Sequence, residues 1–134
     1  MTFRVSPYLI FPGNAIEAIR LYERAFEVKA TAISTFADMP EAVPEHVKHQ
    51  VAHARIDIGE TELLLSDSAG SDIHLGNHMT ICIHAKDSES AKQVYDVLQE
   101  DGDISVPLQA TSFSTAFANV TDQFGVTFQI LAES

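Results

Sequence analysis

The chain has 134 residues, of which 46% are hydrophobic and 20% charged, and its formal net charge is −11. This length and composition are typical of one globular domain that can bury a core, and no apolar run approaches the roughly 20 residues of a membrane span. The acidic excess disfavours nucleic acid and anionic lipid as partners. The single cysteine, Cys82, is typical of a protein from a reducing compartment, so we expect a cytoplasmic protein in which Cys82 is a buried small hydrophobe.

The first half begins with a strand pattern over Val5–Phe11, which Pro12-Gly13 ends. Asn14 can cap a helix, with Glu17 at capping-box spacing. The residues that follow form one apolar helical stripe: Ala15, Ala18, Ile19, Tyr22, Ala25 and Phe26. Three strands are predicted next, with a mobile loop or lid over Ala37–Val47: Lys29–Phe36, Gln50–Ile58 and Thr61–Asp67.

The second half repeats this order at an offset of about 73 residues, which is the distance from Asn14 to Asp87. Met79–Ala85 is predicted as a strand, and Asp87 as the cap of a helix. The stripe of this helix is Ala91, Val94, Tyr95 and Leu98, and three strands follow over Ile104–Leu108, Phe113–Val120 and Val126–Leu131. The same offset pairs Ala18 with Ala91, Leu21 with Val94, and Tyr22 with Tyr95.

Each half is therefore predicted as a β-α-β-β-β module, over residues 1–67 and 78–134 of a single domain that spans 1–134. One helix covers only one face of a four-stranded sheet, so the second sheet can cover the other face. The sequence thus predicts an α+β fold with paired sheets and a central cleft. A ferredoxin-like repeat is the competitor, and the third strand after each helix argues against it.

Several blocks along the chain resemble one family: Pro7–Ala15, Tyr22–Phe26, Val51–Gly59, Leu63–Asp67, Val106–Gln109 and Thr121–Val126. They are similar to blocks of PhnB-like proteins, a branch of the vicinal oxygen chelate (glyoxalase/bleomycin resistance/dioxygenase) superfamily. The resemblance implies a glyoxalase-like fold of paired βαβββ modules and a homodimer, in a family whose members often have no assigned function. The family commonly has Trp-Gly after the position of Phe113, where this chain has Ser114-Thr115, which predicts a smaller or more polar pocket wall.

Enzymes of the superfamily hold a divalent ion with His, Glu or Gln side chains from both halves. The resemblance places these ligand positions on Pro7, Leu64, Thr80 and Gln129. Pro7 and Leu64 cannot ligate through their side chains, Thr80 is a poor ligand, and the one neutral oxygen of Gln129 does not make a metal site. We therefore predict no metal ligand and no cofactor. The alternative is a displaced metal site built from His53, His78, His84 and Glu62, beside Arg55.

Strand alternation indicates which side chains face the predicted cleft. Ile81 and Ile83 should face the helix, which leaves Thr80 and His84 toward the cleft, and the 73-residue offset places Leu9 and Phe11 on the matching face. His53 and Arg55 share one face of a central strand, where they could bind an anion; otherwise His53 is a satisfied, partly buried histidine. The predicted ligand-binding residues are His53, Arg55, Leu9, Phe11, Leu64, Thr80, His84 and Gln129.

The residues favour a protein that binds a small molecule in the cleft without the usual metal centre. The alternative function is a metal-dependent lyase, isomerase or dioxygenase of the glyoxalase type that uses the displaced His/Glu ligands. A structural or regulatory homodimer without a small ligand is a third hypothesis. A homodimer is expected in each case, and the sequence leaves open whether the halves pair within one chain or across the dimer.

Overall fold

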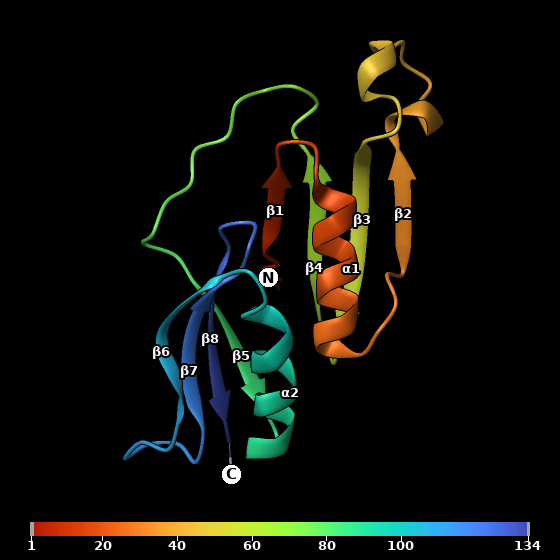
Figure 1. Ribbon diagram of the computed structural model, residues 1–134. Coiled ribbons are helices and arrows are strands. Elements are labelled where there is room, and N and C mark those ends of the chain that lie inside the picture. The colour runs from red at the N-terminus through yellow and green to blue at the C-terminus, as the bar shows by residue number, and fades with distance from the viewer. Residues whose placement is uncertain (1, 134) are drawn as a thin grey trace. The chain divides into compact units, whose positions relative to one another are not determined.

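The computed structural model describes residues 2–133, which form two compact units divided between His74 and Leu75. Each unit has the element order β-α-β-β-β (Figure 1), which confirms the predicted α+β class with two βαβββ halves. The predicted cleft and the module limits 1–67 and 78–134 stay predictions. Neither helix of the described residues is long and apolar enough to cross a membrane.

The first unit is a four-stranded sheet with one helix. Its strand order is β1-β4-β3-β2, in which β1 is parallel to β4 and the other pairs are antiparallel. The elements are β1 (Tyr8–Phe11), α1 (Ala15–Phe26), β2 (Ala32–Thr35), β3 (Val51–Ile58) and β4 (Thr61–Asp67). Two short 3₁₀ turns, Phe36–Asp38 and Glu45–Val47, occupy the segment predicted as a lid.

The second unit has the same topology, with strand order β5-β8-β7-β6 and β5 parallel to β8. Its elements are β5 (Ile81–Ala85), α2 (Ser88–Leu98), β6 (Asp103–Gln109), β7 (Phe117–Thr121) and β8 (Thr127–Ala132). In each unit the helix lies against one face of its own sheet (Figure 1). We call the opposite face of each sheet its helix-free face.

The apolar stripes predicted for both helices are largely buried against the sheets. Along α1, Ala18, Ile19 and Tyr22 are fully buried, and so are the residues that face the helix from β3 and β4: Ala54, Ile56 and Leu65. In the second unit the fully buried apolar residues are Ala91, Leu98, Ala118, Val120, Phe128 and Ile130. Each large apolar side chain buried in this way contributes about 1.5–3 kcal/mol, so these two layers hold each unit together.

The two helices begin in different ways. The Asp87 carboxylate accepts a hydrogen bond from the Ser90 N–H at 2.8 Å, which confirms Asp87 as the cap of α2. The prediction that Asn14 caps α1 through its side chain is wrong, because Asn14 occupies the cap position without a side-chain cap bond. Asp67 of β4 supplies the carboxylate instead and accepts from the N–H groups of Gly13 at 3.0 Å and Ala15 at 2.9 Å.

The prediction that Leu9 and Phe11 lie on the face away from the helix is also wrong. Phe11 is 2% exposed, and Leu9 pairs with the fully buried Leu65. The cause is a one-residue difference between the halves: three residues separate β1 from α1, whereas two separate β5 from α2. The two helix caps, Asn14 and Asp87, are 73 residues apart, whereas the last residues of the preceding strands, Phe11 and Ala85, are 74 residues apart. A slip of one residue moves every side chain of a strand to the other face.

The strand predicted over Phe113–Val120 begins only at Phe117. The Ser114 hydroxyl lies 2.8 Å from the Ala116 carbonyl and 2.7 Å from the Ala132 carbonyl, and it also accepts from the Ala116 N–H at 3.2 Å. A serine hydroxyl that satisfies nearby backbone groups competes with a regular ladder. Residues 110–116 therefore form a loop, which we call the β6–β7 loop.

Candidate functional site

The helix-free face of the first sheet carries apolar residues on one side and charged residues on the other. Tyr8 and Ile10 of β1 are 46% and 53% exposed, and Leu64 lies beside Tyr8 in the strand register. Arg55 of β3 is the partner of Leu64 on the other side, and His53 lies two residues from Arg55. Of the predicted site residues, the structure therefore brings His53, Arg55 and Leu64 together on this face.

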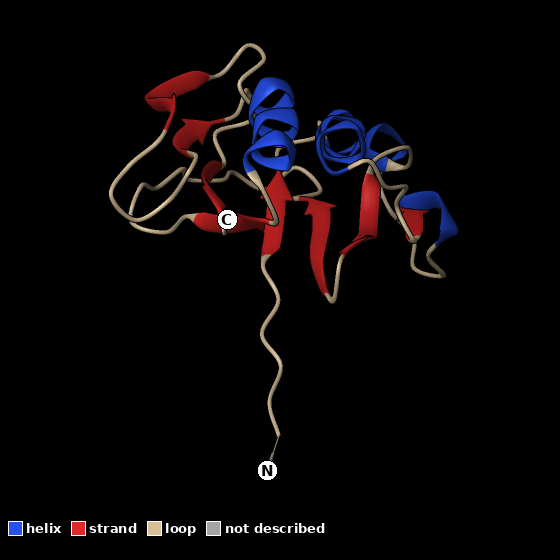
Figure 2. Ribbon diagram, turned by 90° about the horizontal axis from the view of Figure 1, so that it is seen from below, coloured by secondary structure: helices blue, strands red, loops and turns tan. Residues whose placement is uncertain are grey.

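The charged part of this face is an ion-pair network around Glu62, whose side chain is only 7% exposed. Glu62 pairs with Arg4, accepts from the Ser6 hydroxyl at 2.9 Å and lies 3.4 Å from Arg55 Nε. Arg4 and Ser6 belong to the extended segment that runs outward before β1 (Figure 2). A buried carboxylate requires such partners, because an unpaired charge is costly to bury.

Arg55 is therefore already paired before any ligand arrives. Its Nε also donates to Asp57 Oδ1 at 2.8 Å, and this hydrogen bond, followed by one from Thr31, holds the pKa of Asp57 below its ordinary range. Two carboxylates offset the guanidinium charge, which makes Arg55 a weaker anion partner than its sequence context suggests. His53 is exposed, with its ring 6.3 Å from that of Tyr8, and its predicted ligand-binding role stays a prediction.

The helix-free face of the second sheet has a polar row at its centre. Gln129 of β8 pairs with Cys82 of β5 on one side and with Asn119 of β7 on the other. The residues on either side of Asn119 in the chain, Ala118 and Val120, are fully buried toward α2, so the Asn119 side chain lies on the helix-free face. Thr80 precedes β5 and is exposed, and by alternation it shares this face with Cys82.

Two polar atoms of this row differ from expectation. Asn119 Oδ1 is buried without a hydrogen-bond partner in the structure. Sequence reasoning missed Asn119, although its position between Ala118 and Val120 is the alternation that could have found it. Cys82 was expected to be buried but is exposed. Partial burial, with the Glu133 carboxylate as a second cause, raises the pKa of the Cys82 thiol, which therefore stays protonated at neutral pH.

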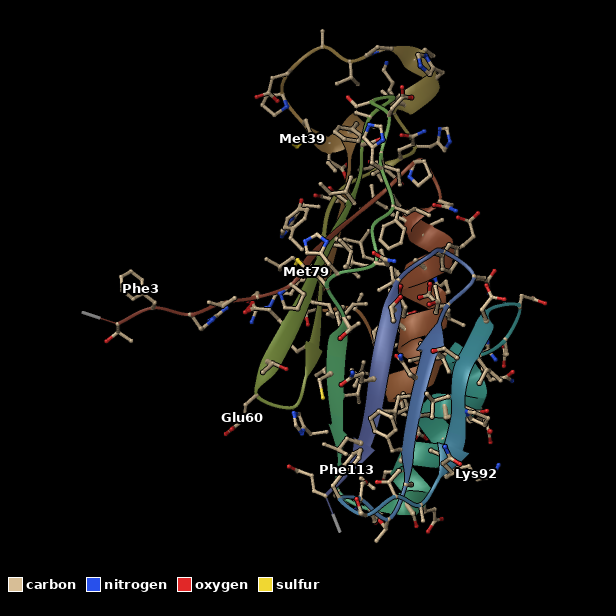
Figure 3. All side chains as sticks on the ribbon, turned by 90° about the vertical axis from the view of Figure 1, so that its left-hand side faces the viewer. Phe3, Met39, Glu60, Met79, Lys92 and Phe113 are labelled. Carbon is tan, nitrogen blue, oxygen red and sulfur yellow. The ribbon has the colours of Figure 1, made fainter. Side chains whose placement is uncertain are left out.

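At the end of this face a cavity of about 370 Å³ opens beside the β6–β7 loop. Its lining is Ala110, Thr111, Ser112, Phe113, Ser114, Thr115, Ala132 and Glu133. The Phe113 ring is 66% exposed and packs edge-on against Phe117, with 5.2 Å between the ring centroids. Figure 3 shows this face of the second sheet, with Phe113 at the end where the loop lies.

The cavity keeps its form because the loop is tied to the sheet. Ser114 bonds to the Ala132 carbonyl, the Thr111 N–H donates to the Ser114 carbonyl at 2.9 Å, and the Phe113 N–H donates to Thr111 Oγ1 at 3.3 Å. The Ser114 hydroxyl thus fixes the backbone of the loop. His84 of β5 lies near the same end, with Nδ1 3.6 Å from Glu133 Oε2.

The residues of the predicted displaced metal site are divided between the two units. Among residues 2–133, no group of three or more His, Cys, Asp or Glu side chains could hold a metal ion. His53 and Glu62 belong to the first unit, whereas His78 and His84 belong to the second. The displaced metal site stays a prediction that the donor sets of the described residues do not favour.

Comparison with known proteins places this fold in a class and the chain in a family. The glyoxylase/bleomycin resistance protein/dioxygenase domain from Frankia sp. EAN1pec shares the fold, with a TM-score of 0.68 at 12% identity over 98% of this chain and 92% of that one. The protein therefore has a glyoxalase-like fold. Residues 4–131 match the family model described as 3-demethylubiquinone-9 3-methyltransferase, and the chain belongs to this family.

Two solved structures are similar over nearly the whole chain. Protein PA1353 from Pseudomonas aeruginosa is 29% identical, with a TM-score of 0.88 over 98% of each chain. A PhnB protein from Bacillus cereus is 25% identical, with a TM-score of 0.80 over 97% of this chain and 99% of that one. These similarities confirm the PhnB-like resemblance.

Proposed function

We propose that this protein binds a small organic molecule on the helix-free face of the second sheet. The cavity of about 370 Å³ beside Phe113 carries this proposal. Ligand sites in proteins have volumes of about 300–1,000 Å³ and combine apolar walls with a few polar groups. Here the ring of Phe113, which packs against Phe117, provides an apolar wall, and Gln129 and Asn119 provide polar groups farther along the face.

Three of the predicted site residues lie on the sheet face that we propose for binding, and two lie on the face that α1 covers. Thr80, His84 and Gln129 lie on or beside the helix-free face of the second sheet. Leu9 and Phe11 are removed, because they lie on the face that α1 covers. His53, Arg55 and Leu64 remain candidates for a separate contact on the first sheet, where charged groups already pair with one another.

The family's description names a methyl-transfer reaction. We limit the proposal to binding, because the cavity supplies a recognition surface and the described residues assign no group to methyl transfer. We propose no cofactor for binding.

The expected homodimer also stays a proposal. Exposed apolar side chains in the first unit support it, namely Phe3, Val5, Tyr8 and Ile10. Sedimentation velocity tests the dimer, and the cytoplasmic location stays a prediction.

The test is a titration of the full chain with tyrosol, a neutral phenol, followed by backbone amide shifts in NMR spectra. We expect shifts in the β6–β7 loop and at the end of β8. Phe113→Ala should weaken binding by about tenfold, because a contact with an aromatic side chain is worth roughly 1–1.5 kcal/mol. Phe113 is exposed, so its loss should leave the fold intact.

Lys92→Ala is the matched control, since Lys92 lies on α2 and pairs there with Asp96 (Figure 3). This variant should bind tyrosol as the native chain does. Shifts confined to the first unit, or binding that Phe113→Ala leaves unchanged, would show that the ligand site lies elsewhere.

A further inference from the structure

The charge at the cavity end of the second sheet comes from Glu133. Its backbone is held in place, because the Glu133 N–H donates to the Ala85 carbonyl at 2.8 Å. Its side chain lines the cavity and is 62% exposed, with His84 Nδ1 at 3.6 Å. A carboxylate therefore stands at the mouth of the cavity.

The negative charge of Glu133 also acts on other groups of this face. It contributes to the raised pKa of the Cys82 thiol, after the larger effect of burial. The net charge of the whole chain has the same sign, at −11. A negative field of this kind raises the local concentration of cations and lowers that of anions.

One acceptor at the centre of the face lacks a hydrogen-bond donor in the structure. Asn119 Oδ1 is a buried acceptor without a partner. Such an atom costs free energy until a donor reaches it, so a ligand that brings an N–H or O–H group gains by pairing with it. The two acceptors, Asn119 Oδ1 and the Glu133 carboxylate, thus favour the same kind of ligand.

The aromatic wall agrees with this preference. The exposed Phe113 ring lines the same cavity as Glu133, and the face of an aromatic ring attracts a cation. Glu133 directly follows β8 and lies four residues after Gln129, a span of about 13 Å in extended chain. A small elongated molecule can therefore reach from the cavity toward the polar row.

We infer that the ligand is an organic cation whose ammonium group pairs with Glu133 and whose N–H or O–H group donates to Asn119. This inference rests on the proposed function and names the class of molecule that the site selects. Three phenols that differ only in the charge of their tail test it: tyramine is cationic, tyrosol is neutral and phloretic acid is anionic at neutral pH.

The dissociation constant of each phenol is measured by amide shifts on the full chain and on three variants. We expect tyramine to bind about tenfold more tightly than tyrosol, because an exposed ion pair and a cation–π contact add to the shared phenol contacts. Phloretic acid should bind most weakly. Glu133→Gln should remove most of the difference in dissociation constant between tyramine and tyrosol.

Glu60→Gln makes the same change of charge at the exposed β3–β4 turn and should change no dissociation constant (Figure 3). Asn119→Leu should weaken tyramine and tyrosol alike, by about fivefold. If phloretic acid or tyrosol binds at these amides as tightly as tyramine, or if Glu133→Gln has no effect, the cation preference is wrong and the binding site stands. If none of the three phenols shifts these amides, the proposed function fails as well.

Discussion

Replacing Asp67 with asparagine should destabilise the first unit more than any comparable change at an exposed aspartate. The Asp67 carboxylate is 5% exposed and joins three parts of the chain. One oxygen accepts from the N–H groups of Gly13 and Ala15 at the start of α1, and the other accepts from the Val51 N–H at 2.9 Å, at the start of β3. Asparagine has nearly the same shape, so the substitution removes the charge and one acceptor.

The magnitude follows from two losses. If the amide oxygen stays toward α1, the amide nitrogen meets the Val51 N–H, and a buried N–H left without an acceptor costs about 1–3 kcal/mol. The start of α1 also loses a negative charge, which is worth about 0.3–1 kcal/mol at a helix N-terminus. Together these losses predict a decrease of about 2–3 kcal/mol in the free energy of unfolding.

Urea unfolding followed by far-ultraviolet circular dichroism measures this change. Asp57→Asn is the control: Asp57 pairs with Arg55 on an exposed part of the same sheet, and its loss should lower the free energy of unfolding much less than Asp67→Asn does. If Asp67→Asn and native chains unfold within about 0.5 kcal/mol of each other, Asp67 does not hold α1 and β3 in the way described.

Three further predictions concern stability. Burial favours a raised pKa for Glu23, but hydrogen bonds from a backbone N–H and an arginine outweigh it and hold the pKa below 4.5. The stability that Glu23 adds is therefore present above pH 4.5 and lost as pH falls through the folded-state pKa. The native chain should exceed the Glu23→Gln variant in free energy of unfolding, and this difference should be larger at about pH 7 than at about pH 3. A Cβ at Gly102 would lie 2.3 Å from a backbone carbonyl oxygen, so Gly102→Ala should lower the free energy of unfolding in urea by about 2–3 kcal/mol. Gly59→Ala is the control and should cost about 1 kcal/mol, because φ is +58° there but the space around a Cβ is open. Asp87→Ala should lower the midpoint of thermal unfolding more than Asn14→Ala does, because only Asp87 makes a side-chain cap bond, and equal losses would contradict the difference between the two caps.

The fold was predictable because the signals that define it are local. The stripe of α1, the cap of α2 and the strand patterns each depend on residues a few positions apart, and the repeat joined them into two equal halves. The face of the sheet on which each strand side chain lies was less predictable. Alternation placed His84 on the helix-free face, but the offset failed at Leu9 and Phe11, since one extra residue before α1 reverses the face of β1.

The candidate site was only partly predictable, because it depends on contacts between distant residues. Gln129 was found through the family resemblance and His84 by alternation, whereas Glu133 enters the site only through the pairing of β8 with β5. The β6–β7 loop was predicted as strand, because the bonds of Ser114 to the end of β8 leave no periodic signal in the sequence. Arg55 was correctly placed on the helix-free face, but its pairing with Glu62 required the register between β3 and β4.

The position of Asp67 also has a consequence for the order in which the first unit can form during synthesis. The carboxylate that completes the start of α1 lies 52 residues after Ala15, in the last strand of the unit. A nascent chain that ends before β4 contains the whole of α1 without its anchor. The helix should therefore fray at its first turn on the ribosome until β4 has emerged, and the unit should become resistant to protease in one step rather than strand by strand.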